Sequence, residues 1–313
     1  MTNLLLPARP VEGSPQKTSV GFRRIVVATD FALDGDRAIR RAGRLPLGAK
    51  ATVVVAHVLP ASVPMSASSV VEGAADQELQ AARIKLVDLL DRRGRHDVVV
   101  RTRLVHGDAA EEIGRIAKRT AADLVVVGRG RSQLSGALLG TTAQRVARNA
   151  RVPVLLVRQQ PAASYRRVVL GFDASPDARR AARLVRSVAG SQAAVISLFA
   201  FEDPRATLAP TLFKAAARAR WRAFKPNLAS TARQVRKMLE AVDPARRWIL
   251  SFKPGDPRQR LVESARKKGA DLIVVGSRSR RGLPRLALGS VAEAILNQAT
   301  CDVLVSPRQR LVL

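Results

Sequence analysis

The chain has 313 residues with 54 Lys or Arg against 25 Asp or Glu, so its formal net charge is +29, and it has one cysteine. A content of 47% hydrophobic and 25% charged residues excludes wholesale disorder, and the single cysteine excludes an internal disulfide framework. No apolar run approaches the ~20 residues of a transmembrane helix and the start lacks the basic region of a secretory signal, so we expect a cytoplasmic protein of two domains.

Apolar runs of strand length alternate with amphipathic stretches of helix length along the first half of the chain. We predict strands at 25–28, 52–58, 98–104, 124–127 and 154–157, and helices at 36–45, 76–93, 109–120 and 140–149. Continuous runs of Val, Ile and Leu are typical of strands buried on both faces, as in a parallel sheet covered by helices. The alternation predicts a doubly wound α/β fold, in which ligands bind beyond the carboxyl ends of the strands.

The second half of the chain repeats the first. The matching segments are 23–30 with 166–173, 122–128 with 270–276, 139–141 with 288–290, and 152–157 with 301–305. The joint falls near 159–164, which divides the chain into a tail over 1–20, a first domain over 21–160 and a second domain over 161–313. The repeat predicts two tandem five-stranded parallel sheets.

A glycine-rich segment follows the fourth strand of the first copy. It contains Gly128, Gly130 and Gly140, and Gly140 opens the helix predicted over 140–149, whose first turn carries Thr141 and Thr142. Glycines let backbone N–H groups approach an anion closely, and a helix N-terminus with hydroxyl side chains offers further donors. The segment is neither a Walker motif nor a dinucleotide fingerprint. Because the second copy has a similar loop at the same place, we predict a phosphate-binding loop in each copy.

An aspartate ends the first strand of each copy, Asp30 in the first and Asp173 in the second. In the predicted fold these carboxylates lie across from the glycine-rich loop. They could accept hydrogen bonds from an adenine amino group or from ribose hydroxyls. They could equally cap the helix that follows, as Asp often does, and the sequence leaves both roles open.

Both copies resemble the universal stress protein family, and the resemblance covers residues 21–308. The motifs that carry it are the apolar first strand ending in Asp, the Ala-Asp-Leu-Val/Ile-Val-Val-Gly fourth strand, and the glycine-rich loop that ends in Gly-Thr/Ser. The resemblance implies the strand order 3-2-1-4-5 and a pseudo-twofold dimer formed by the two copies within one chain. In one subgroup of the family it implies ATP binding through a Gly-x2-Gly-x9-Gly-Ser/Thr loop.

Each copy departs once from that loop pattern. The three positions are Gly128, Gly130 and Gly140 in the first copy, and Gly276, Ser279 and Gly289 in the second. The first spacing of copy one is a residue short, which flanking glycines can absorb, whereas Ser279 costs ~1 kcal/mol if its φ must be positive. Phe172 also brings a bulky ring to the end of the first strand in copy two. We therefore expect the first copy to be the better ATP site.

The resemblance assigns nucleotide contacts to strand ends and loops in both copies. The candidate residues are Ala28, Thr29, Asp30, Val58, Val127, Gly128, Gly130, Arg131, Gly140, Thr141, Thr142, Asp173, Val275, Gly276, Ser279, Gly289, Ser290 and Val291. The sequence contains no nucleophile–base pair and no metal-ligand spacing, so we predict no catalytic residue and no protein metal site. We expect ATP, accompanied by Mg²⁺, to serve a regulatory or stress-response role with at most slow hydrolysis.

Two other functions remain open. Imperfect loops are consistent with an interaction module of the same fold that binds no nucleotide. The positive charge is consistent with nucleic-acid binding, although no recognised nucleic-acid-binding motif is found. The excess is +10 over 21–160 and +18 over 161–313, and thus heavier on the copy with the poorer loop. A homodimer is also left open.

The segment 208–238 differs from its counterpart in the first copy. Trp221, Phe224 and Leu228 fall at helical spacing, and basic side chains cover the remaining face. One interpretation is the second helix of the fold, packed on the sheet with a solvated basic face. The others are a basic amphipathic surface for acidic lipid or nucleic acid, and a lid over the nucleotide.

Overall fold

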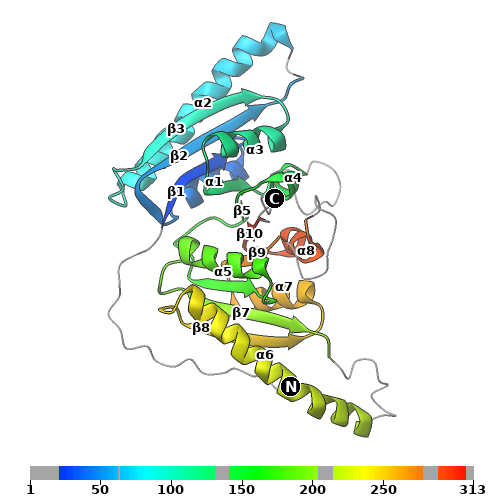
Figure 1. Ribbon diagram of the computed structural model, residues 1–313. Coiled ribbons are helices and arrows are strands. Elements are labelled where there is room, and N and C mark those ends of the chain that lie inside the picture. The colour runs from blue at the N-terminus through cyan, green and yellow to red at the C-terminus, as the bar shows by residue number, and fades with distance from the viewer. Residues whose placement is uncertain (1–20, 63, 131–140, 204–213, 278–287, 308–313) are drawn as a thin grey trace, which may run out of the picture.

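The computed structural model describes residues 21–62, 64–130, 141–203, 214–277 and 288–307 (Figure 1). The predicted tail over 1–20 lies outside these residues. The elements of the first half are β1 (Phe22–Ala28), α1 (Leu33–Ala42), β2 (Leu47–Leu59), α2 (Met65–Asp91), β3 (Val99–His106), α3 (Ala109–Arg119), β4 (Leu124–Gly128), α4 (Thr141–Asn149) and β5 (Val154–Val157). Those of the second half are β6 (Arg167–Gly171), α5 (Pro176–Val188), β7 (Ala194–Phe201), α6 (Lys214–Val242), β8 (Trp248–Pro254), α7 (Pro257–Lys268), β9 (Leu272–Gly276), α8 (Ser290–Gln298) and β10 (Asp302–Ser306).

The strand order of each half is the expected 3-2-1-4-5. The first half reads β3-β2-β1-β4-β5 and the second reads β8-β7-β6-β9-β10, with parallel pairing inside each half. The fold class is therefore confirmed. Parallel strands need crossover connections, and each helix between consecutive strands supplies one.

The two halves meet at their last strands and form one ten-stranded sheet. Strand β5 pairs antiparallel with β10, and Leu155 lies opposite Leu304. These two leucines are equivalent positions of the repeat. The pairs on either side, Val154 with Val305 and Leu156 with Val303, are also related by the repeat. The register is thus symmetric about the Leu155–Leu304 pair, as an approximate two-fold relation between the halves requires.

Each face of the sheet has its own apolar core. One core cluster contains buried side chains of α1, α2, α5 and α6, and the other contains those of α3, α4, α7 and α8. Side chains alternate between the two along a strand: Ile25 and Val27 belong to the first cluster and Val26 to the second. Both clusters include residues from both halves, so the core is continuous across the junction.

The aspartate of the fourth-strand motif has a structural role in each half. Asp123 Oδ2 accepts hydrogen bonds from the backbone N–H groups of Arg23 and Arg24, at 2.8 and 2.9 Å. In the second half Asp271 does the same at the start of β6, at 2.7 and 3.1 Å. Both aspartates lie at the amino edge of the sheet, away from the ligand edge, and they fix the register between the first and fourth strands.

A buried carboxylate joins the two halves near the connecting segment. Asp302, at the start of β10, is fully buried. Its Oδ1 accepts the backbone N–H groups of Arg158 and Gln159, at 2.8 and 3.1 Å. Its Oδ2 accepts the Tyr165 hydroxyl at 2.6 Å and Arg41 Nε at 3.1 Å. We call these five residues the Asp302 network; it ties α1 and the connecting segment of the chain to the last strand of the second half.

Tyr165 should titrate abnormally because it lies inside this network. Burial raises the pKa of its hydroxyl well above the usual range, and the Asp302 carboxylate raises it further. Tyr165 is the one tyrosine of the chain, so tyrosinate absorbance reports on it alone. We expect no tyrosinate near pH 10 while circular dichroism shows a folded protein, and ordinary titration near pH ~10 in denaturant.

The sign of the accompanying stability change follows from the same shift. Because the pKa of Tyr165 is higher in the folded than in the unfolded protein, the stabilisation by its protonated hydroxyl is fully present below pH ~10. It is lost as the pH rises further. Removing the carboxylate charge with Asp302→Asn should move the Tyr165 titration toward lower pH, since burial alone then raises its pKa. Titration of the folded wild-type protein at the ordinary tyrosine value would contradict the buried position of the hydroxyl.

Candidate functional site

The site lies where the strand order reverses, beside the carboxyl ends of β1 and β4 in the first half and of β6 and β9 in the second. From β1 the chain continues to β2 on one side, while β4 pairs on the other side. Because the chain leaves β1 and β4 in opposite directions, folds of this type have a crevice between the loops that follow these two strands. The predicted residues at the ends of these strands are therefore brought to one edge of the sheet in each half.

In the first half, a tight turn carries the chain from β1 into α1. Thr29 is buried and its Oγ1 accepts the N–H of Phe31 at 3.0 Å. Asp30 is exposed and its Oδ1 accepts the N–H of Ala32 at 3.1 Å. The turn requires φ of 58° at Phe31, and the equivalent Ala174 has φ of 61°. Asp30 thus caps the turn with one oxygen and presents a carboxylate at the rim.

His57, at the end of β2, also holds this turn in place. Its Nδ1 lies 2.8 Å from the Thr29 carbonyl oxygen, and its ring stacks on Phe31 with centroids 4.1 Å apart. Because a carbonyl can only accept, Nδ1 carries the hydrogen and donates it. The ring therefore joins the ends of β1 and β2, which accounts for a histidine here without any catalytic role. Its neighbour Val58 is half-buried against the second core cluster.

The end of β4 is pressed against the start of α1. Val127 is buried, and a Cβ added to Gly128 would lie 2.3 Å from the backbone oxygen of Asp34. Gly130 has φ of 75°, a conformation that favours glycine. Arg131 and Gly140 lie outside the described residues. Helix α4 begins at Thr141, and the side chain of Thr142 is exposed.

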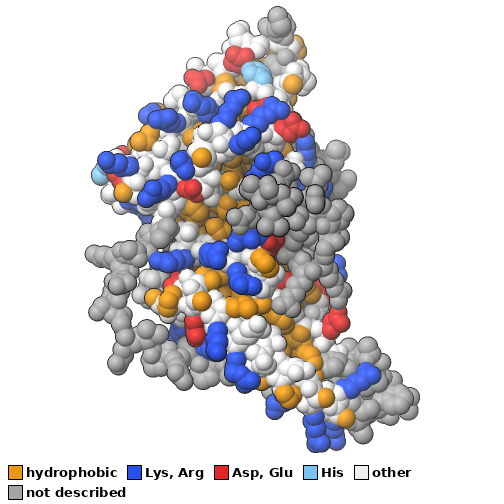
Figure 2. All heavy atoms as spheres, viewed as in Figure 1, with side chains coloured by type: hydrophobic (Ala, Val, Ile, Leu, Met, Phe, Trp, Pro, Cys, Tyr) orange, Lys and Arg blue, Asp and Glu red, His pale blue; other side chains and the backbone are white. Residues whose placement is uncertain are grey.

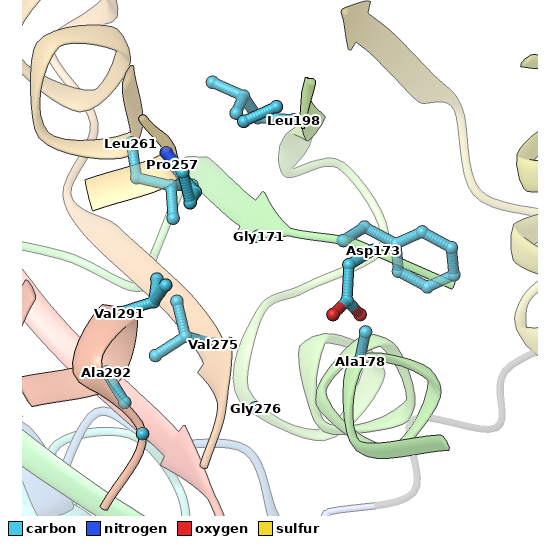
Figure 3. A pocket seen from close by; sticks show the side chains of 13 residues that line it. Gly171, Asp173, Ala178, Leu198, Pro257, Leu261, Val275, Gly276, Val291 and Ala292 are labelled. Atoms are coloured by element: carbon cyan, nitrogen blue, oxygen red, sulfur yellow. The ribbon is translucent and has the colours of Figure 1, made fainter. Parts of the chain in front are cut away.

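In the second half, the corresponding edge contains a cavity of about 110 Å³ (Figure 3). Its lining comes from the ends of β6, β7 and β9 and from α5, α7 and α8; the residues are Gly171, Phe172, Asp173, Ala178, Leu198, Ala200, Pro257, Leu261, Val275, Gly276, Gly289, Val291 and Ala292. Figure 3 shows the Asp173 carboxylate on one side and Val275, Val291 and Ala292 across from it. The cavity combines an apolar wall with one carboxylate, as a site for a ring bearing N–H or O–H donors would.

The two ends of this cavity offer opposite kinds of hydrogen-bonding group. Asp173 Oδ1 accepts the N–H of Ser175 at 3.0 Å, so this aspartate too caps its turn and still has acceptor capacity. At the other end, Gly289 is the N-cap of α8 and has no side chain to cap it. The first-turn N–H groups, beginning with exposed Ser290, therefore point outward with the positive end of the helix dipole. Carboxylate and helix end together suit a ligand with donors at one end and an anion at the other.

The ring of Phe172 packs in the core and does not fill the cavity. Although Phe172 lines the cavity, its side chain is 2% exposed and belongs to the first core cluster. The sequence-based expectation of a weaker second site therefore depends on Ser279, which lies outside the described residues.

Sequence reasoning missed the part of the lining that comes from α7. Pro257 and Leu261 lie in its first turns, behind the Gly255–Asp256 turn in which Asp256 caps the helix by accepting the N–H of Arg258 at 2.8 Å. The Gly-Asp sequence of this turn could have predicted that α7 begins here. It places the start of α7 at the same edge of the sheet as the loop ends, and so next to the ligand.

The architecture defines a tandem, doubly wound α/β protein with a ligand-binding edge in each half. The sequence pattern of the universal stress protein family matches residues 21–158 and again 164–307. The chain therefore belongs to the universal stress protein family, as a member with two copies of the domain.

Relatives and solved structures agree with this assignment. The chain is 28% identical over 217 residues to the universal stress proteins Mb2019 of Mycobacterium bovis and Rv1996 of Mycobacterium tuberculosis, a match that covers 65% of this chain and 64% of each relative. It thus spans less than two thirds of the length of these relatives. A universal stress protein of Archaeoglobus fulgidus has a similar structure, with a TM-score of 0.66, 16% identity, and coverage of 92% of this chain and 99% of that one. A functionally unknown protein of Pseudomonas aeruginosa, PA1789, has a TM-score of 0.56, 19% identity, and coverage of 91% and 92%. The structural likenesses show the fold.

In the part of the chain that the structure describes, no helix combines the length and the apolar character needed to cross a membrane. Within the same part of the chain, no three His, Cys, Asp or Glu side chains gather into a group that would hold a metal ion.

Proposed function

We propose that this chain binds ATP or a related adenine nucleotide at the ligand edge of each half, and that it acts as a regulatory or stress-response protein. The observation that supports this most is the second-half cavity, where an apolar wall, the Asp173 carboxylate and the uncapped start of α8 surround one space. Adenine and ribose carry the donors that Asp173 would accept. Phosphates carry the charge that a helix N-terminus favours.

The apolar wall of this cavity suits the base of a nucleotide, and the N–H groups at the start of α8 suit its phosphates. The base would lie against Val275 and its apolar neighbours, and the phosphates would extend toward Gly289 and Ser290. Mg²⁺ would accompany the triphosphate. With no nucleophile–base pair in the sequence, hydrolysis is expected to be slow at most.

The first half is proposed as the tighter site, because its loop retains three glycines. Asp30 and Asp173 occupy equivalent turns, so the same change from Asp to Asn, made at one position at a time, can weaken each site separately. Asparagine keeps the oxygen that caps the turn and removes the charge. We expect Asp30→Asn to weaken the tighter of two ATP-binding steps about 5-fold or more, and Asp173→Asn to weaken the other, because hydrogen bonds to charged groups are the stronger ones.

Isothermal titration calorimetry with ATP measures both steps. Asp88→Asn, an exposed aspartate of α2 paired with Arg92, is the matched control and should bind as the wild type does. Absence of heat with wild-type protein at millimolar ATP would leave the alternative, an interaction module that binds no nucleotide. Mass analysis of small molecules released from freshly purified, denatured protein identifies which adenine nucleotide is carried.

A further inference from the structure

Helix α6 carries an unusual concentration of positive charge. Its sequence contains eight Lys or Arg and a single Glu, whereas α2, the equivalent helix of the first half, contains two basic and five acidic residues. The two helices occupy the same place in the fold, after the second strand of each half. The difference is therefore independent of the fold itself, and it accounts for much of the greater charge of the second half.

The apolar face of α6 is used within the protein. Leu228, Val235 and Leu239 are buried in the first core cluster. Nearer the start of the helix, Trp221 and Phe224 pack on Phe201 of β7, with ring centroids 6.4 and 5.5 Å away. The interpretation of segment 208–238 as the second helix of the fold is thus correct for the described part. Its basic face still needs an explanation.

Five exposed cations follow one side of α6, spaced four, three, eight and four residues apart. We call them the basic stripe: Arg218, Arg222, Lys225, Arg233 and Lys237. At 1.5 Å per residue the stripe is about 28 Å long. The described residues provide no acidic partner for any of the five. On a neighbouring side of the helix, Arg236 pairs with Glu240 at 3.8 Å. Figure 1 shows the start of α6 projecting past the sheet, and Figure 2 shows a row of Lys and Arg side chains along it.

We propose that the basic stripe binds the phosphate backbone of duplex nucleic acid, independently of base sequence and of the nucleotide sites. Along this projecting helix, with Pro226 between Lys225 and Arg233, the five cations without an acidic partner among the described residues can reach successive phosphates, and Arg pairs well with phosphate oxygens. Single-stranded nucleic acid is usually held by exposed aromatic rings on which bases stack. The described aromatic rings of α6, Trp221 and Phe224, are instead packed against Phe201.

An anionic membrane is the competing partner, and the structure favours it less. A helix that lies in a membrane interface buries an apolar face among the lipids. In α6 that face is packed on the sheet, and the large hydrophobic side chains that are exposed in the described chain, Leu33, Val70, Ile84 and Val99, all lie outside α6.

The test is fluorescence anisotropy of a labelled 25-base-pair duplex titrated with the full chain at several salt concentrations. If all five cations contact phosphates, a plot of the logarithm of the association constant against the logarithm of the salt concentration should have a slope of about −4.5. Binding should then weaken about 500-fold between 50 and 200 mM salt, and should not depend on the base sequence of the duplex.

Replacing the five stripe residues by Gln removes the charge and keeps good helix formers. We expect this variant to lose at least about 30-fold in affinity at 50 mM salt and about 4.5 units of salt slope, since each lost phosphate contact reduces the slope by about 0.9. Replacing the three stripe arginines by Lys should preserve binding within about 3-fold, because Lys still binds phosphate as a point charge.

The control removes the same number of exposed cations from the first half: Arg101, Arg103, Lys118, Arg119 and Arg151, each changed to Gln. This variant should keep the affinity within about 3-fold, because charges far from the stripe are screened at these salt concentrations. Equal losses in both five-residue variants would mean that net charge alone attracts the duplex, and would overturn the proposal. So would binding to vesicles of anionic lipid without binding to the duplex. Thermal melting of each variant confirms that it is folded.

Discussion

Replacing Asp302 with Ala is expected to lower the free energy of unfolding by about 3–5 kcal/mol. Breaking a buried ion pair by removing one partner leaves the other charge buried and uncompensated, and that is the dominant cost. Here the orphaned charge is Arg41, whose side chain is 5% exposed. The substitution also removes the acceptor of the Tyr165 hydroxyl and of the Arg158 and Gln159 N–H groups. Each buried donor left unsatisfied adds to the loss.

A double-mutant cycle separates the ion pair from the rest of the network. Arg41→Leu introduces the residue found at the equivalent position of the second half, Leu184. Arg41 also donates to the Ala163 carbonyl at 2.9 Å and lies 4.0 Å over the Tyr165 ring, so this single change should itself be costly. We expect the double variant to be less destabilised than the two single variants added together, with a coupling of at least about 1 kcal/mol.

Urea denaturation followed by circular dichroism and by tryptophan fluorescence measures these changes. Asp88→Ala is the control: it breaks an ion pair to Arg92 whose side chains are 51% and 74% exposed, and should cost under about 1 kcal/mol. An Asp302→Ala variant as stable as Asp88→Ala would contradict the assigned role of the buried carboxylate. If the transitions from the two probes separate, the halves unfold independently once the network is lost.

The fold could be predicted from the sequence because its signals are local and are repeated. The strand at 154–157 was predicted with the bounds that the structure has. The strands at 98–104 and 124–127 differ by at most two residues at either end, whereas those at 25–28 and 52–58 begin three and five residues earlier than predicted. The widest difference is α2, predicted from residue 76 and observed from Met65. Its first turns read Met-Ser-Ala-Ser-Ser, without the apolar spacing that identifies a helix resting on a sheet. Helix α1, predicted over 36–45, ends at Ala42, where Gly43 follows as the C-cap.

The relation between the halves was harder to predict. Runs such as Val154–Val157 and Val303–Val305 indicate buried strands, but they do not specify which strand edges pair. The symmetric β5–β10 register is set by contacts between segments about 150 residues apart. Asp302 illustrates the same limit. Its equivalent in the first copy is Pro153, so the repeat gave no indication that a carboxylate there would be buried with four donors around it.

The candidate site was predicted in part. The structure brings the ends of β6 and β9 to one edge, where Asp173, Val275, Gly276, Gly289 and Val291 all line the same cavity. Their contact with a nucleotide stays a prediction. The glycine-rich loops themselves lie largely outside the described residues, so their contacts with phosphate stay predictions. The sequence could not reveal that Phe172 points its ring into the core, because the face on which a side chain lies is decided by strand register.

Replacing Gly128 with Ala is expected to destabilise the protein and disturb the first ligand edge together. The added Cβ would lie 2.3 Å from the Asp34 carbonyl oxygen and 2.5 Å from its carbonyl carbon. Both atoms are backbone in the first turn of α1, so no side chain can rotate away and the helix itself must shift. Overpacking of this kind costs about 1–3 kcal/mol, and we expect a value at the upper end. Because the turn of Thr29 and Asp30 leads directly into α1, ATP affinity at the first site should fall as well.

Two other glycines of the same chain provide comparisons for the stability cost of a Gly→Ala change. At Gly276, the equivalent position of the second half, the nearest atoms of Asp177 would be 3.0 Å away, so Gly276→Ala should cost less, about 1 kcal/mol. Gly114 lies within α3 with nothing within 4 Å of an added Cβ, so Gly114→Ala should stabilise the protein by about 0.5–1 kcal/mol through helix propensity. Thermal melting should therefore rank the variants Gly114→Ala, wild type, Gly276→Ala and Gly128→Ala in falling stability. A Gly128→Ala variant that melts with the wild type would show that α1 can move away from β4 without cost, and that this contact does not hold the turn of Asp30 in place.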